Sequence, residues 1–249
     1  MKRIYYYAAF LIAVTFMMSA CSTGTKINTL SKKDKESEFV LLFNGENVDG
    51  WKGYQRDDFP TNWVVEDGLL HCLGSGRGEA GAEDGGDILF NKKFSNFHLK
   101  LEWKISKGGN SGIFYLGEEL PQYDKIYYTA PEMQVLDNAN HPDAILGVDG
   151  NRKAGSLYDL IPAVPQNANP FGEWNSAEII CFKGTVIHKM NGKVVLEYHL
   201  WTSEWNEMVA NSKFPGLNPD WAKVATEGFI GLQDHGDDVW FRNIMIKEM

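Results

Sequence analysis

Apolar and polar residues alternate along much of the chain after Phe39, and the alternation is unbroken from His98 to Ile105. A period of two is typical of a β-strand with one face buried. In this stretch, the residues predicted to face the core are Leu99, Leu101, Trp103 and Ile105, and those predicted to face outward are Lys100 and Glu102.

Three further strand-like runs, 178–182, 186–190 and 194–198, are joined by the dipeptides Lys183-Gly184 and Asn191-Gly192. Both dipeptides are hairpin signals, and Asn-Gly favours a type I′ turn. Two more runs, 228–233 and 239–246, are separated by a turn-rich loop. The pattern predicts an antiparallel meander with a long central interruption. Because strands and helices do not alternate, a parallel doubly wound sheet or barrel is disfavoured.

One stretch has helical spacing, from about Ser203 to Ser212, where Trp205, Met208 and Val209 recur on one face. Thr202 or Ser203 is the expected N-cap. We therefore expect an all-β fold with one short peripheral helix.

The N-terminus has the features of an export signal. Lys2 and Arg3 precede an apolar run from Ala8 to Met18, and small residues lead to Cys21. The run is shorter than a membrane span and ends in a small-small-Cys pattern, which is typical of a bacterial lipoprotein signal peptide. We expect residues 1–20 to be removed, Cys21 to be lipidated, 21–38 to be a flexible tether and 39–249 to be one domain. The residue after Cys21 is not Asp, which favours an anchor in the outer membrane facing the periplasm.

The net charge bears on which macromolecules the protein can bind, and the cysteines bear on whether it contains a disulfide. The formal net charge is −9, and loss of Lys2 and Arg3 with the leader makes it −11, so nucleic acid is an unfavourable partner. Cys72 and Cys181 each lie in an apolar strand-like run. Although an oxidising compartment permits a bond between them, the sequence favours two separate buried thiols.

Six ordered blocks carry a resemblance to a known family. They are Leu42-Phe43-Asn44-Gly45 with Gly50-Trp51; Gly109 to Ile113; Pro131 to Asp137; Gly155 to Tyr158; Gly172 to Asn175; and Gly231 to His235 with Phe241 to Ile244. In this order they resemble the 3-keto-disaccharide hydrolase family over about residues 39–248. The resemblance implies a concanavalin-like jelly-roll sandwich of two antiparallel sheets and the cleavage of glycosides already oxidised at C3. An oxidoreductase that makes the 3-keto sugar is then an expected functional partner, and no cofactor is expected.

A ketone at C3 makes the C2 proton acidic, and loss of this proton allows the group on C1 to leave, after which water adds. This route needs a general base, donors for the enolate oxygen and a proton source for the departing oxygen. Three alternatives stay open: a conventional glycosidase with two carboxylic acids, a non-catalytic lectin and a structural envelope protein.

Glu132 is the expected general base or acid, since it shares a strand face with Gln134 while Met133 and Val135 point to the core. Asp137 ends this strand, where it either contacts substrate or caps a turn. His235 follows the strand 228–233 and is suited to proton transfer near neutral pH. The alternative is that the loop around His235 only closes a hairpin, with the His235 side chain exposed to solvent.

The remaining candidates are substrate contacts. Glycines around Asn110 and Ser111 permit close approach of a sugar, or simply form a tight turn. Tyr115 and Tyr158 either stack on a sugar ring or belong to the core. Arg242 alternates in phase with Trp240 and Ile244, so it is expected to point inward or toward a cleft. The proposed substrate-binding set is Asn110, Ser111, Tyr115, Gln134, Asp137, Tyr158, Gln233, Asp234 and Arg242. No histidine pair has a metal-ligand spacing, so a zinc site is not predicted.

Overall fold

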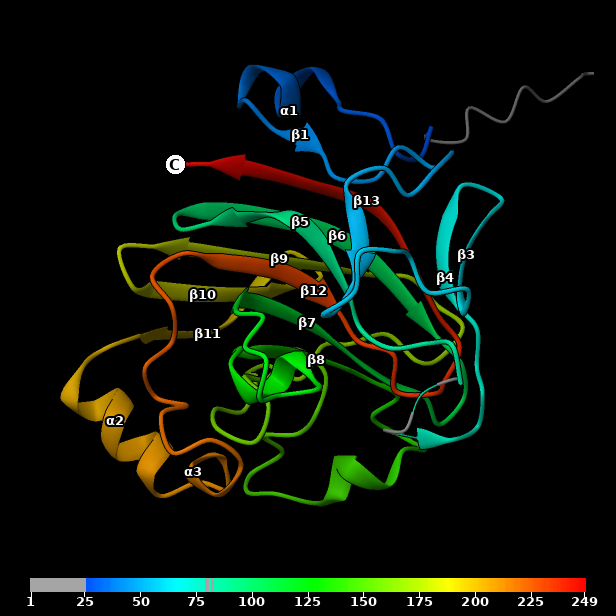
Figure 1. Cartoon of the computed structure of the whole chain (residues 1–249). Helices are drawn as coiled ribbons and strands as arrows, with labels where there is room; N and C mark the ends of the chain where they lie inside the picture. The colour runs from blue at the N-terminus through cyan, green and yellow to red at the C-terminus, as the bar shows by residue number, and fades with distance from the viewer. Residues whose placement is uncertain (1–25, 79–80, 82) are drawn as a thin grey trace, which may run out of the picture.

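Two antiparallel sheets make up most of the structure, a computed structural model that describes residues 26–78, 81 and 83–249. The sheets lie one over the other (Figure 1). This confirms the predicted all-β, concanavalin-like sandwich. The predicted signal peptide and Cys21 lie outside the described residues.

The larger sheet has the strand order β11-β10-β9-β6-β13-β4-β3, and β1 pairs with β13. Its strands are β1 (Val40–Leu41), β3 (Trp63–Glu66), β4 (Leu69–Cys72), β6 (Phe97–Ile105), β9 (Asn175–Phe182), β10 (Thr185–Met190), β11 (Lys193–His199) and β13 (Val239–Glu248). The smaller sheet has the order β2-β5-β12-β7-β8. Its strands are β2 (Trp51–Gly53), β5 (Ile88–Phe94), β7 (Asn110–Gly117), β8 (Glu132–Leu136) and β12 (Gly228–Leu232).

The local predictions for the larger sheet are confirmed. In β6 the four residues predicted to face the core are buried, and the two polar ones between them are only half-buried. Both hairpin dipeptides have positive φ at their two residues, as a type I′ turn requires, with φ of 49° and 83° at Lys183-Gly184 and 47° and 77° at Asn191-Gly192. Cys72 and Cys181 are separate buried thiols.

The two sheets enclose an apolar core with a polar contact across it. Tyr115 on β7 contacts His188 on β10 and Tyr198 on β11, with its hydroxyl 2.8 Å from His188 Nε2 and 2.6 Å from Tyr198 Oη. Burial lowers the pKa of His188 to about 4, so this imidazole is neutral at physiological pH. Tyr115 is therefore a core residue that joins the sheets.

Three α-helices are present in the described part of the chain: α1 (Lys32–Glu36), α2 (Ser203–Ala210) and α3 (Phe214–Leu217). Two 3₁₀ turns, η2 (Ile126–Tyr128) and η3 (Pro142–Ile145), lie in the loops around β8. Helix α2 confirms the predicted helix, and the Thr202 hydroxyl accepts a hydrogen bond from Trp205 N as its N-cap. Helix α3 was not predicted, because four residues are too few to show helical periodicity. None of the described helices is long and apolar enough to cross a membrane.

Residues 26–38 differ from the tether expected for this stretch, because they pack on the sandwich. Asn28 is 6% exposed. Its backbone N–H donates to Asn243 Oδ1 at 2.6 Å, and its Oδ1 accepts from Asn243 N at 2.8 Å. Asp34 in α1 pairs with Lys100 on β6 at 3.1 Å. The folded unit therefore begins before Phe39, since long-range amide pairing holds a polar segment that has no apolar pattern of its own.

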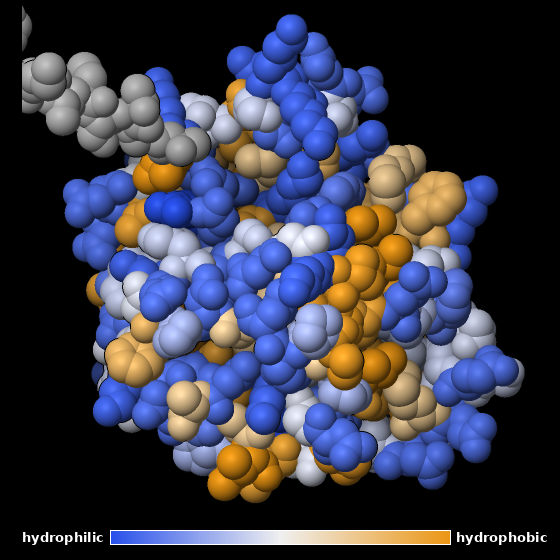
Figure 2. Space-filling model, turned by 180° about the vertical axis from the view of Figure 1, so that it is seen from behind, coloured by the Kyte–Doolittle hydropathy of each residue, from blue (hydrophilic) through white to orange (hydrophobic). Residues whose placement is uncertain are grey.

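Figure 2 shows the face opposite to that of Figure 1, where hydrophilic residues cover most of the surface and hydrophobic ones gather in a band and at the lower edge. Several large apolar side chains are exposed in the loop that follows β8, including Ile145, Leu146 and Val148. This loop also carries residues that lie beside the pocket described next.

Candidate active site

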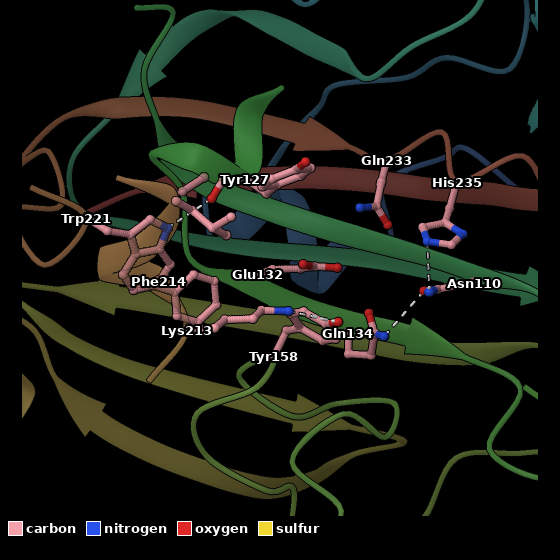
Figure 3. A pocket seen from close by; sticks show the side chains of 12 residues that line it. Asn110, Tyr127, Glu132, Gln134, Tyr158, Lys213, Phe214, Trp221, Gln233 and His235 are labelled. Atoms are coloured by element: carbon pink, nitrogen blue, oxygen red, sulfur yellow. Dashed lines mark hydrogen bonds between the residues drawn. The ribbon is translucent and has the colours of Figure 1, made fainter. Parts of the chain in front are cut away.

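A pocket of about 220 Å³ lies on the face of the smaller sheet that points away from the larger one. Its floor comes from β7 and β8, and its walls come from the loops on either side of β8, the α2–β12 segment and the end of β12. The twelve residues that line it are Asn110, Tyr127, Ala130, Glu132, Gln134, Tyr158, Lys213, Phe214, Leu217, Trp221, Gln233 and His235 (Figure 3).

Glu132 and Gln134 both line the pocket, whereas Met133 and Val135 belong to the core. The predicted faces of β8 are therefore confirmed. Among the lining residues that the structure describes, Glu132 is the only carboxylic acid. Its side chain lies in the middle of the pocket in Figure 3.

Glycine on the neighbouring strand makes room for the Glu132 carboxyl group. Gly112 on β7 pairs with Gln134 on β8. A Cβ atom at position 112 would lie 2.1 Å from Glu132 Oε1, which is closer than any real contact. The sequence predicted that glycine here permits close approach, and the structure shows that Glu132 itself makes this approach.

Burial controls the charge of Glu132. The residue Glu132 is 7% exposed, and desolvation of its carboxyl group raises the pKa of Glu132 to about 8, against the opposing attraction of Lys213 and His235. A carboxylate with this pKa is a stronger base than an ordinary glutamate. Perturbed acids of this kind are typical of catalytic sites.

Three polar side chains continue from Glu132 along the floor. Asn110 Nδ2 lies 3.3 Å from His235 Nε2, and Gln134 Nε2 lies 3.3 Å from Asn110 Oδ1. With its amide turned over, Gln134 places Nε2 3.0 Å from both Glu132 Oε1 and Ser111 O. The imidazole of His235 is largely buried, which contradicts the alternative of an exposed hairpin histidine.

The opposite end of the pocket is aromatic. Phe214 and Trp221 stack with ring centroids 4.0 Å apart, and Trp221 also stacks on Trp205 of α2 at 5.7 Å. Trp205 in turn stacks on Tyr198 of β11 at 5.5 Å. This ladder of rings ties the segment after α2 to the larger sheet and so positions one pocket wall.

A cation lies at the same end. Lys213 Nζ is 3.2 Å from Tyr158 Oη and 4.3 Å from the centroid of its ring. The Tyr158 hydroxyl donates to Asp143 Oδ2 at 3.0 Å. Burial and the nearby carboxylates of Glu132 and Asp143 raise the pKa of Tyr158, so the hydroxyl keeps its proton.

Phe214 and Trp221, which form the aromatic wall of the pocket, and Lys213 were not predicted as site residues. These residues lie in loops around η2 and α3, far apart in the sequence, and nothing in their local pattern indicates that they converge. The density of aromatic residues between Trp205 and Trp221 was the available signal.

Five predicted contacts do not line this pocket, and four of them have structural roles close to it. Ser111 and Tyr115 lie on the core-facing side of β7, where Ser111 donates to Gln233 O at 2.8 Å. Asp137 is a turn cap, since its carboxylate accepts from Gly108 N at 2.8 Å and Ala139 N at 3.1 Å. The role of Asp137 matches the capping alternative, whereas Ser111 lies inside strand β7 rather than in a tight turn. Asp234 accepts from the backbone N–H groups of residues 86 and 236 and is structural.

Arg242 also lies away from the pocket, on the outer face of the larger sheet. It donates to Glu102 Oε2 at 2.7 Å, and its guanidinium lies 3.9 Å from the ring of Trp174. A bulge explains the error in its predicted face. The pairing register shifts after Arg242, and Asn243 has φ of 52°, so Ile244 is buried although Arg242 points outward.

A group with metal-ligand chemistry lies beside the pocket. Potential ligand atoms of His141, His235 and Asp237 all lie within 4.8 Å of one another. Spacing alone missed this group, because His141 comes from a distant loop. However, His141 Nδ1 accepts from Asp143 N at 3.1 Å and Asp237 Oδ2 accepts from Asn110 N at 3.0 Å. Backbone amides thus already hold two of these side chains, and we assign no metal to them.

A second buried acid lies behind Gln233. Asp87 is 3% exposed, and desolvation raises its pKa to about 6. Its Oδ1 accepts from Asp234 N at 3.1 Å. Asp87 lies beside Gln233, and it is not among the residues that line the main pocket.

A family model and a curated relative place the chain in the same protein family. Residues 38–247 match the family model described as a 3-keto-alpha-glucoside-1,2-lyase-like domain. A 3-keto-disaccharide hydrolase of Bacteroides thetaiotaomicron is 46% identical over an alignment of 288 positions, which covers 99% of each chain.

Solved structures of two glycosyl hydrolases from Parabacteroides distasonis ATCC 8503 are also similar. One has a TM-score of 0.80 and 32% identity, covering 90% of this chain and 100% of the other. The second has a TM-score of 0.67 and 26% identity, covering 85% and 100%.

Proposed function

Because the chain belongs to the family of 3-keto-alpha-glucoside-1,2-lyase-like domains, we propose that this glycoside hydrolase cleaves sugars oxidised at C3 by elimination and hydration. The C2–H bond breaks first and its electron pair forms the enolate of the C3 ketone. Collapse of the enolate expels the oxygen on C1, which takes up a proton, and water then adds to the enone. The family assignment also separates this chain from a lectin and from a structural envelope protein.

One observation carries the proposed mechanism: a single buried carboxylic acid among the pocket residues. A conventional glycosidase places two carboxyl groups about 5–9.5 Å apart across the scissile bond. Of the described residues that line the pocket, only Glu132 has a carboxyl group. Elimination next to a ketone needs one base rather than two acids. The site therefore favours proton abstraction over direct displacement.

The two ends of the pocket suggest how the substrate lies. Asn110, Gln134, Gln233 and His235 offer hydrogen bonds at one end, and an aromatic wall closes the other (Figure 3). The oxidised sugar would lie at the polar end, with C2–H toward Glu132 and the enolate oxygen near the amides. The leaving group would lie along the aromatic wall, where Lys213 can supply the proton.

The size of the pocket supports a small substrate. Its volume of about 220 Å³ is below the roughly 300–1,000 Å³ of pockets for drug-sized ligands. We therefore propose that it encloses one oxidised sugar residue and the start of the leaving group. Since the ketone must be made beforehand, an oxidoreductase acting on C3 is the proposed supplier of the substrate.

Deuterium incorporation tests the mechanism. Hydrolysis of a 3-keto-glucoside in heavy water is expected to place deuterium at C2 of the 3-keto-glucose product, beyond the exchange seen without enzyme. Loss of a general base lowers rates about 100- to 10,000-fold, so Glu132→Gln should suppress cleavage and labelling together. Cleavage of unoxidised glucosides at the same rate, without labelling at C2, would instead establish direct displacement.

We also propose that the protein is exported and held in the outer membrane by acylation of Cys21. The support is the sequence pattern of residues 1–21. A lipid anchor would keep the enzyme where oligosaccharides enter the cell envelope.

A further inference from the structure

Three charged side chains form a cluster behind the end of the pocket where Lys213 lies. Arg152 is between the two acids of this cluster, donating from Nη1 to Asp143 Oδ1 at 3.0 Å and from Nε to Asp159 Oδ1 at 2.5 Å. The three side chains are at most 20% exposed, so these contacts are largely shielded from water. We call these three residues the Arg152 cluster, and none of them lines the pocket.

Each acid of the cluster turns its second oxygen toward the pocket wall. Asp143 Oδ2 accepts from the Tyr158 hydroxyl at 3.0 Å, and Asp159 Oδ2 lies 3.6 Å from Lys213 Nζ. The guanidinium group is planar and rigid, and it holds the first oxygen of both acids. The two second oxygens therefore keep fixed positions relative to each other.

Backbone contacts hold the two acids within the loop that follows β8. Asp143 N donates to His141 Nδ1 at 3.1 Å, and Asp159 N donates to Asn151 O at 2.9 Å. Lys213 comes from a different part of the chain, the segment between α2 and α3. The cluster is thus a fixed support against which the Lys213 side chain is placed.

The cluster decides which hydrogen bonds Lys213 can make. The Tyr158 hydroxyl has one proton, which it donates to Asp143, so Tyr158 Oη can only accept from Lys213 Nζ at 3.2 Å (Figure 3). The ion pair with Asp159 attracts a second N–H of the ammonium group. Since an ammonium group has three N–H donors, one is left for a ligand in the pocket.

We infer that the residues of the Arg152 cluster are positioning residues, which hold Lys213 so that it offers one N–H to the oxygen leaving C1. The inference rests on the proposed function in taking the C1–O bond as the bond that breaks. As this bond breaks, Lys213 gives one proton to the departing oxygen and becomes an amine. The amine then takes a proton from the water that adds to C1, while Glu132 returns a proton to C2. Both groups thereby regain their starting states.

Replacing either acid by asparagine is expected to displace Lys213. Arg152 only donates hydrogen bonds, so the amide oxygen of an asparagine would face Arg152 and its NH₂ group would face the pocket wall. At position 159 this NH₂ group would meet the ammonium of Lys213, donor against donor. At position 143 it would donate to Tyr158, whose own proton would then point toward Lys213.

The test compares two substrates that differ only in the leaving group, the methyl and 4-nitrophenyl glucosides oxidised at C3. 4-Nitrophenolate leaves without a proton, whereas methoxide needs one. The quantity measured is kcat/KM for the methyl glucoside divided by kcat/KM for the 4-nitrophenyl glucoside, after the rate without enzyme is subtracted. This ratio cancels effects on folding and on Glu132. Lys213→Met should lower it about 100-fold or more, as expected for loss of a general acid.

Variants of the cluster should change the same ratio. Asp159→Asn and Asp143→Asn are expected to lower it roughly 10- to 100-fold, because a small displacement of a catalytic group is costly. Asp159→Asn added to Lys213→Met should lower it no further, since the cluster acts through Lys213. Asp220→Asn is the matched control: Asp220 pairs with Lys223 at 2.9 Å, outside the cluster, and its loss should leave the ratio unchanged.

Three results would overturn the inference: a wild-type ratio in Lys213→Met, a wild-type ratio in Asp159→Asn, or a further fall of the ratio in the double variant. A variant that is merely destabilised loses activity on both substrates equally and so keeps the wild-type ratio. Elimination is judged separately, from deuterium at C2 of the product of the wild-type enzyme. Failure of the proposed mechanism and failure of this inference are therefore distinguishable.

Discussion

Replacing Glu132 by glutamine is expected to stabilise the folded protein at alkaline pH while it removes activity. The residue Glu132 is 7% exposed, and desolvation raises the pKa of its carboxyl group from the ordinary 4.5 to about 8. Glutamine has nearly the same shape and carries no charge. The variant therefore avoids the cost of burying an anion without opening a cavity.

The magnitude follows from the linkage between proton binding and folding. Since the pKa of Glu132 is higher in the folded state than in the unfolded chain, the unfolded chain loses its proton first as pH rises. The free energy of unfolding of the wild type therefore falls between pH 4.5 and about 8. At 1.36 kcal/mol per unit of pKa difference, the full loss is about 5 kcal/mol. It is absent below pH 4.5 and complete above pH 8.

Urea denaturation at pH values from 5 to 9 measures this effect for wild type and Glu132→Gln. We expect the variant to gain stability relative to wild type progressively across this range. Glu178→Gln is a control of opposite sign, because hydrogen bonding to His98 and the ion pair with Lys189 lower the pKa of Glu178 to about 2. A stability difference between wild type and Glu132→Gln that is equal at pH 5 and pH 9 would refute the assignment of a destabilised carboxylate.

Three further predictions concern the core, the pocket floor and the anchor. Leu101→Ala should lower the free energy of unfolding by about 2–5 kcal/mol in urea titrations, and a larger loss in Lys100→Ala would contradict the face assignment of β6. Gly112→Ala should displace the Glu132 carboxyl group and lower kcat/KM about 100-fold while circular dichroism shows a folded protein; unchanged kcat/KM would mean that the carboxyl has space to move. Cys21→Ser should release the protein from the membrane fraction or block its processing, whereas a wild-type protein found wholly in the soluble periplasm would exclude the lipid anchor.

The local features of the fold can be predicted from the sequence, because they depend on neighbouring residues only. The alternation in β6, the type I′ turn at Asn191-Gly192 and the N-cap of α2 at Thr202 are all confirmed. Each follows from side-chain direction or backbone sterics within a few residues. The opposite faces of Glu132 and Met133 follow from the same rule.

Two local predictions were wrong, the face of Arg242 and the tether before Phe39. In the first a backbone irregularity, and in the second a contact between distant residues, decided the structure. A bulge at Asn243 turned Arg242 to the outer face, and period-two reasoning has no means of locating an extra residue in a strand. The amide pair between Asn28 and Asn243 ordered a segment that composition alone assigns to a tether.

The sequence by itself determined the all-β class and which residues of β7 and β8 could meet a substrate. Of the predicted site residues, Asn110, Glu132, Gln134, Tyr158, Gln233 and His235 line the pocket. Only the tertiary structure brought Lys213 and the aromatic wall over that face, through ring stacking from β11 to α3. Strand faces follow from the local geometry of the backbone, whereas the position of a loop is decided by packing between residues far apart in the chain.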